Sequence, residues 1–183
     1  MSLSSDEFED QDIFIADILS KNKIIAMVGA SKNWKRPSNF VMKYLQKHGF
    51  TVIPINPGNA GQFILNELCY ASLQEVPIKI DMVNIFRPSE FCASITKDAI
   101  NIGAKTVWMQ LGIKNEEAIN LGKEAKINVI YDKCPKMEHS RLSGALGLAG
   151  FNSRLISSKR PFVKNPPHAK RNGGIVKSIF PPP

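Results

Sequence analysis

The sequence is poor in cysteine and contains no long hydrophobic run. Its three cysteines, Cys69, Cys92 and Cys134, lie far apart, so they form no Cys-x-x-Cys pair for a metal ion and suit a reducing compartment. No apolar run approaches the roughly 20 residues that span a bilayer, and the first residues lack the positive charge of a secretory signal. These absences predict a cytoplasmic protein with no membrane segment and no metal site.

Acidic and basic residues are distributed unevenly along the 183 residues. The net charge of +8 conceals six acids and no base in residues 1–20, and seven bases and no acid in residues 151–183. The latter segment also holds six of the 12 prolines, which is typical of weakly ordered chain. We therefore expect an acidic N-terminal helix or extension over residues 1–20, one domain over residues 21–145, and a basic, proline-rich tail over residues 146–183. Nucleic-acid binding through the tail is an alternative function, although the tail has few aromatic side chains for base stacking.

Short apolar runs alternate with segments of helical periodicity in the middle of the chain. The runs predict strands over 24–28, 51–55, 82–86, 106–109 and 129–131. The periodic segments predict helices over 39–48, 91–102 and 115–125, with Asn115 as an N-cap and a short helical turn around Leu73-Gln74-Glu75. This alternation predicts an α/β fold: a doubly wound, five-stranded, mostly parallel sheet with helices on both faces.

The residues after the first predicted strand are suited to an anion. In such a sheet, ligands bind beyond the carboxyl ends of the strands. Gly29-Ala30-Ser31 is a turn of small residues that leads to a helix beginning near Pro37-Ser38, so it presents free backbone N–H groups. Lys32, Lys35 and Arg36 add positive charge, and a phosphate is the natural guest. The alternative is an ordinary tight turn with solvated lysines.

A nicotinamide cofactor fits this turn less well. The dinucleotide fingerprint Gly-x-Gly-x-x-Gly is reduced to its first glycine in residues 29–34. The second strand ends in Pro54-Ile55-Asn56-Pro57, which offers no acid for a ribose hydroxyl. An NAD(P)-dependent oxidoreductase therefore remains only as an alternative function.

Two later strand ends also carry residues suited to a ligand. Phe86 and Arg87 follow the third strand and offer an aromatic face and a guanidinium. Gln110-Leu111-Gly112-Ile113 follows the fourth strand, where a glycine permits close approach to a ligand. The alternatives are an arginine that covers the sheet end and a simple turn.

Together these segments resemble the CoA-binding-domain family of small, stand-alone, Rossmann-like proteins, which is similar to the CoA-binding domain of the succinyl-CoA synthetase α subunit. The resemblance covers about residues 20–142. It rests on Val28-Gly29-Ala30-Ser31, Arg36-Pro37-Ser38, Pro54-Ile55-Asn56-Pro57, Ile85-Phe86-Arg87, Val107-Trp108-Met109-Gln110-Leu111-Gly112-Ile113 and Asp132-Lys133-Cys134.

The resemblance implies that coenzyme A or an acyl-CoA binds with its phosphate-bearing half over the turn that follows the first strand. The expected cofactor-binding residues are Gly29, Ala30, Ser31, Lys35, Arg36, Pro37, Ser38, Pro54, Asn56, Pro57, Phe86, Arg87, Gln110, Leu111, Gly112, Ile113 and Cys134. The implied function is binding without catalysis, as a sensor, carrier or accessory module, and either a second copy or an enzyme is a candidate partner.

Groups that could catalyse a reaction are few. None of the three histidines, His48, His139 and His168, has a serine or cysteine at a spacing that suggests a nucleophile and its base. Cys134 follows the fifth strand, and nearby lysines would make its thiol more acidic than usual. The favoured alternative is a buried, inert cysteine, so no catalytic residue is assigned.

Overall fold

We describe residues 5–143 of the chain in a computed structural model, with side chains from residue 11 onward. The predicted tail over residues 146–183 lies outside the described residues. The helices are α1 (Ser5–Lys21), α2 (Pro37–Lys47), α3 (Cys92–Asn101), α4 (Glu116–Glu124) and α5 (Pro135–Ser143), with short 3-10 turns η1 (Pro57–Asn59) and η2 (Ser89–Phe91). Within residues 5–143, no helix has the length and apolar character needed to cross a membrane.

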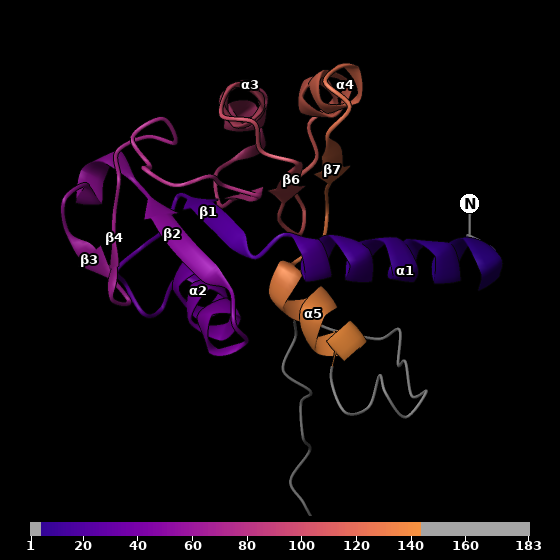
Figure 1. The fold of residues 1–183 in the computed structure, drawn as a ribbon, viewed down its shortest axis with the longest axis horizontal. Helices are drawn as coiled ribbons and strands as arrows, with labels where there is room; N and C mark the ends of the chain where they lie inside the picture. Colours follow the sequence, from indigo (N-terminus) through magenta and orange to yellow (C-terminus); the bar gives the residue numbers. More distant parts are fainter. Residues whose placement is uncertain (1–4, 144–183) are drawn as a thin grey trace, which may run out of the picture. The chain divides into compact units, whose positions relative to one another are not determined.

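A five-stranded parallel sheet forms the centre of the fold (Figure 1). Its strands are β1 (Ile24–Val28), β2 (Thr51–Ile55), β5 (Met82–Ile85), β6 (Thr106–Met109) and β7 (Asn128–Ile130), in the spatial order β2-β1-β5-β6-β7. The order reverses between β1 and β5, since the chain first builds outward to β2 and then returns to build toward β7. This arrangement confirms the predicted α/β, doubly wound sheet, and every pairing in it is parallel.

Helices cover both faces of the sheet, which explains why its strands are almost continuously apolar. On one face, Met27 and Trp108 pack with side chains from α1, α2 and α5. On the other face, Ala26, Val83 and Val107 pack with α3 and α4. Figure 1 shows the same division, with α3 and α4 on one side of the sheet and α2 and α5 on the other.

Helix α1 belongs to the hydrophobic core although its sequence is acidic. Ile15, Ile18 and Leu19 are buried in the cluster that contains Trp108. The guanidinium of Arg141 on α5 donates to both carboxylate oxygens of Asp12 at 2.6 Å. An arginine–carboxylate pair with two parallel hydrogen bonds is geometrically specific, so α1 is fixed to α5 by both apolar packing and charge.

The segment between β2 and β5 differs from the expected short helical turn. It contains an antiparallel pair of two-residue strands, β3 (Phe63–Ile64) and β4 (Glu67–Leu68). Leu65 and Asn66 connect them with positive φ angles of 49° and 68°, as a two-residue hairpin turn of type I′ requires. Around Leu73 the chain forms a single turn, closed by the hydrogen bond from Val76 N–H to Leu73 C=O at 3.3 Å, and no longer helix.

Helix α5, which the sequence patterns did not predict, is held against α2 by aromatic contacts. His139 Nδ1 lies 3.2 Å from the Tyr44 hydroxyl, and its ring meets those of His48 and Phe50 edge to face at centroid distances of 5.2 and 5.4 Å. Burial lowers the pKa of His139, and the charges of His48 and Lys23 lower it further. The lowered pKa favours the neutral form of the imidazole in the contact between α2 and α5.

Candidate functional site

The turn between β1 and α2 depends on a glycine at position 29. Gly29 has a φ angle of +88°, which L-residues rarely adopt, and its N–H donates to Ile55 C=O at 2.9 Å. A Cβ atom at this position would lie 2.4 Å from the carbonyl oxygen of Phe86. The turn therefore passes so close to the end of β5 that no side chain fits.

Two asparagine side chains donate hydrogen bonds to carbonyl groups of the turn. Asn56 Nδ2 donates to Ala30 C=O at 2.8 Å, and Asn39 Nδ2 donates to Ser31 C=O at 2.9 Å. Within residues 5–143, the N–H groups of Ala30, Ser31 and Lys32 have no protein acceptor. Successive free N–H groups in a concave turn form a binding site for an anion.

The start of α2 adds positive potential next to these N–H groups. The helix begins at Pro37, as expected, and has neither a side-chain N-cap nor an acidic residue in its first turn. Lys35 and Arg36, just before it, are exposed. Ser31 Oγ accepts from Asn33 N–H at 3.1 Å, which leaves the hydroxyl proton of Ser31 free to donate. The predicted phosphate-binding turn thus has several donors and no nearby carboxylate in the first turn of the helix.

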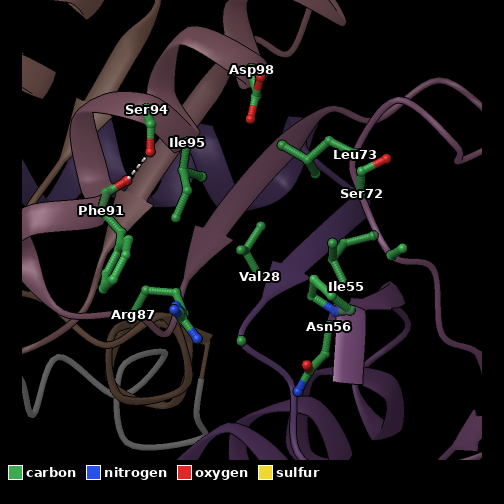
Figure 2. A pocket seen from close by; sticks show the side chains of 13 residues that line it. Val28, Ile55, Asn56, Ser72, Leu73, Arg87, Phe91, Ser94, Ile95 and Asp98 are labelled. Carbon is green, nitrogen blue, oxygen red and sulfur yellow. Dashed lines mark hydrogen bonds between the residues drawn. The ribbon is translucent and has the colours of Figure 1, made fainter. Parts of the chain in front are cut away.

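A cavity of about 250 Å³ opens beside this turn, at the point where the strand order reverses (Figure 2). Its walls are mainly apolar, and polar groups lie at its two ends. The lining comes from the ends of β1, β2 and β5, from the segment after β4, and from η2 and α3. It comprises Val28, Gly29, Ile55, Asn56, Pro57, Ala71, Ser72, Leu73, Arg87, Phe91, Ser94, Ile95 and Asp98.

Arg87 is the cation of this cavity. Its guanidinium carbon lies 4.5 Å from the centre of the Phe91 ring, in a cation–π arrangement. The side chain remains largely exposed, so its N–H donors can reach a ligand. An arginine held against an aromatic ring is suited to a phosphate or to a planar base.

Only part of the expected site lies together in this cavity. Gly29, Asn56, Pro57 and Arg87 line it. A second group lies outside the lining, in the turn that follows Gly29 and at the start of α2: Ala30, Ser31, Lys35, Arg36, Pro37 and Ser38. The remaining expected residues, Pro54, Phe86, Gln110, Leu111, Gly112, Ile113 and Cys134, do not line it.

The segment after β6 lies outside the cavity lining and is hydrogen-bonded within the protein. The buried side chain of Gln110 donates to Asn84 Oδ1. Gly112 N–H donates to Asp132 Oδ1 at 2.7 Å, and Ile113 packs into the core beneath α3 and α4. Leu111 is the exposed member of the segment.

Three other expected site residues, Phe86, Pro54 and Cys134, also lie outside the cavity lining. Phe86 packs on the sheet face that carries α2 and α5, whereas its neighbour Arg87 lines the cavity on the α3 side. Pro54 is buried within β2. Burial raises the pKa of the Cys134 thiol. The raised pKa argues against an unusually acidic thiol, and the burial of Cys134 agrees with the favoured alternative of a buried cysteine.

Sequence reasoning missed the residues that α3 and the segment after β4 contribute. Phe91 ends η2, and Ser94, Ile95 and Asp98 follow on α3 at the spacing i+3, i+4 and i+7, so the three α3 residues share the helix face that continues from Phe91. The periodicity identified Phe91 and Ile95 as apolar positions of that face, but the polar members were not read as site residues. No comparable pattern marks Ala71, Ser72 and Leu73.

Comparisons with known proteins found one matching family model and several similar proteins. The model of the CoA binding domain matches residues 23–140. The uncharacterized protein YneT of Bacillus subtilis is 37% identical over 126 residues, which cover 69% of this chain and 92% of YneT. A hypothetical protein of known structure from Pyrococcus horikoshii is 39% identical, with a TM-score of 0.69, over 73% of this chain and 92% of that one.

A much longer enzyme contains a similar stretch. The ADP-forming acetate–CoA ligase II of Archaeoglobus fulgidus is 31% identical over 159 residues, which cover 84% of this chain but only 22% of the ligase. The match to the family model spans well over half of the sequence, and its residues contain the sheet, the turn and the cavity. The chain therefore belongs to the CoA binding domain family.

Proposed function

We propose that this protein binds coenzyme A or an acyl-CoA at the carboxyl ends of its strands and does not itself catalyse a reaction. One observation carries the proposal: the three free N–H groups of the Gly29 turn adjoin an apolar cavity that contains Arg87. This arrangement offers N–H donors for a phosphate beside an apolar pocket for a base, and a nucleotide needs both. Family membership supports the choice of coenzyme A.

The size of the cavity indicates which part of the ligand it takes. Pockets that enclose a whole drug-sized ligand are about 300–1,000 Å³, and this cavity is about 250 Å³. Coenzyme A is larger than most such ligands, so only one end of it enters. The apolar walls suit the adenine base, and the pyrophosphate then reaches the N–H groups of Ala30, Ser31 and Lys32.

The chemistry of the lining supports binding without turnover. The cavity contains no histidine and no cysteine among its described residues. A ligase whose chain includes a similar stretch supports a role as an accessory module to an enzyme, whereas the small relative YneT supports a protein that acts alone. A sensor or carrier and an enzyme-bound module are both forms of this proposal.

Isothermal titration calorimetry tests the proposal. We expect coenzyme A and acetyl-CoA to bind, dephospho-CoA to bind more weakly because it lacks the 3′-phosphate, and NAD⁺ to bind more weakly still. The absence of binding by coenzyme A and acetyl-CoA at millimolar concentration would overturn the proposal. NAD⁺ binding as tight as that of coenzyme A would favour the oxidoreductase alternative instead.

A pair of lysine variants tests the placement of the phosphates. Lys35 lies just before α2, and Lys47 is the last residue of the same helix. Both are exposed, so Lys35→Gln and Lys47→Gln remove the same charge at opposite ends. An exposed charge contact contributes about 0.2–1 kcal/mol, so Lys35→Gln should weaken coenzyme A binding by a factor of about 1.4 to 5. Lys47→Gln should leave the affinity unchanged, and an equal effect of both would place the phosphates elsewhere.

A further inference from the structure

Among the described residues that line the cavity, Asp98 carries the only carboxylate. It lies on α3 and is half-buried. Its Oδ1 accepts from Gln74 Nε2 at 3.0 Å, which holds the carboxylate in place from the segment before β5. Among residues 11–143, no side chain or backbone group donates to its Oδ2, so one acceptor remains for a ligand.

The other hydroxyl groups of the lining are already engaged. Ser94 Oγ donates to Phe91 C=O at 3.0 Å, which Figure 2 marks, and Ser72 Oγ donates to Glu75 Oε1 at 3.1 Å. Their protons are therefore directed to protein acceptors rather than to a guest. A donor group of a ligand in this part of the cavity has Asp98 as its charged acceptor.

Asp98 and the phosphate-binding turn lie at opposite ends of the cavity. In Figure 2, Asp98 is at one end, and Arg87 and Asn56 are at the other. The apolar side chains of Val28, Leu73 and Ile95 lie between these ends. A planar base that fills the apolar part, with its phosphates at the turn, therefore directs its far edge toward Asp98.

The chemistry of that edge distinguishes purine bases. An ionised carboxylate only accepts hydrogen bonds. Adenine carries an exocyclic amino group at position 6, which donates, whereas hypoxanthine and guanine carry an oxygen there, which accepts. Carboxylates accept in the same way from the exocyclic amino group of cytosine. A 6-oxygen that faces Asp98 leaves two acceptors opposed, and such a base can pair with the carboxylate only by shifting to present its neighbouring N1–H.

We infer that Asp98 is a specificity-determining residue that selects adenine through its 6-amino group. The inference rests on the proposed function, because it assumes that the cavity takes the base of coenzyme A. It goes further by assigning the choice of base to one carboxylate and by requiring that Gln74 positions it. Asp98 then acts in binding specificity and in no chemical step.

The experiment compares two ligands on one protein: coenzyme A and deamino-CoA, in which hypoxanthine replaces adenine. The wild type should prefer coenzyme A by at least about tenfold, as expected for one hydrogen bond to a charged group. Asp98→Ala should lose most of that factor for coenzyme A, keep its affinity for deamino-CoA, and so bring the ratio close to one. Asp98→Asn, whose amide can either accept or donate, should bind both ligands with similar affinity.

The control is Glu124→Gln, which removes a charge from an exposed position on α4, a helix outside the cavity lining. It should keep the wild-type ratio. Thermal unfolding of each variant shows that it is folded, and the ratio of two affinities on the same protein does not depend on its active fraction. Equal binding of both ligands by the wild type, or an unchanged ratio in Asp98→Ala, overturns the inference while coenzyme A binding stands. Failure of the wild type to bind either ligand overturns the proposed function and the inference with it.

Discussion

Gly29→Ala tests whether the turn after β1 must lack a side chain. The substitution has two costs that can be separated. An L-residue in the left-handed region costs about 1–2 kcal/mol, and Gly29 has a φ of +88°. The added Cβ would also lie 2.4 Å from the Phe86 carbonyl oxygen, closer than real Cβ atoms approach backbone. The end of β5 must shift to accept it, and overpacking of this kind typically costs about 1–3 kcal/mol.

Gly103→Ala is the matched control, because it has the first cost without the second. Gly103 has a φ of +72°, and a Cβ there would meet nothing within 4 Å. We expect a loss of about 1–2 kcal/mol for Gly103→Ala and of about 2–5 kcal/mol for Gly29→Ala. Each kcal/mol lowers the Tm of a domain of this size by about 2–4 °C.

Urea unfolding followed by circular dichroism gives both free energies of unfolding, and calorimetry gives the affinity for coenzyme A. Gly29→Ala should lose affinity because the N–H groups of Ala30 and Ser31 move with the turn. Gly103→Ala should not affect binding, because Gly103 lies between α3 and β6, at the edge of the sheet where the strands begin. The reasoning is refuted if Gly29→Ala is no less stable than Gly103→Ala, or if it binds coenzyme A as the wild type does.

Three further predictions concern other contacts of the fold. Asn56→Ala removes the hydrogen bonds to Ala30 C=O and from Gly58 N–H. It should lower the free energy of unfolding by about 1–3 kcal/mol and weaken coenzyme A binding; a stability equal to that of the wild type in urea would contradict it. His139 has a lowered pKa, so the unfolded state binds more protons and stability should fall as the pH drops below the ordinary value of 6.5. His139→Gln should flatten this part of the pH profile, and parallel profiles for the two proteins would count against the assignment. Cys134, whose pKa burial raises, should react with iodoacetamide at pH 8 only slowly in the native protein and fast in urea, as peptide mass spectrometry can show; rapid native labelling would contradict its burial.

The central sheet could be predicted because each of its strands is an apolar run that helices cover on both faces. Such strands keep their pattern whatever the details of packing, and the predicted ranges differ from the observed ones by a residue at most. Asn115 was identified as a helix cap, and its Oδ1 accepts from Ala118 N–H at 2.8 Å. Local chemistry of this kind can be read directly from the residue type.

The hairpin and α5 could not be predicted in the same way. Strands of two residues are too short to show an alternation, and Leu65-Asn66 lacks the glycine that usually marks a type I′ turn. Helix α5 has Pro135 as its one fully buried residue and rests on partly buried contacts such as those of Met137 and His139. Its position depends on partners from α1 and α2, which no local pattern contains.

The candidate site was predicted where it is made of backbone and missed where it is made of side chains from distant segments. The Gly29 turn follows from sequence because glycine and small residues after a strand have few other uses. The contribution of Asp98 requires knowing that α3 packs against β5 and β6 with one face toward the cavity, since nothing in its own neighbourhood indicates a ligand. Conversely, Gln110 looked like a site residue because it follows a strand, yet its amide is bonded to Asn84 inside the protein.

The attachment of α1 means that the part of the chain recognised by sequence and the part that folds as a unit have different ends. The family match begins at residue 23, but Ile15 and Leu19 complete the core over Trp108, and Asp12 holds Arg141. A protein truncated to residues 23–140 would expose that apolar surface, and it would also lack Arg141 and the end of α5. Loss of ligand binding in such a fragment would reflect incomplete folding and would say nothing about a contact between α1 and the ligand. Deletion mapping of this family should therefore start from the buried surface and not from the limits of sequence similarity.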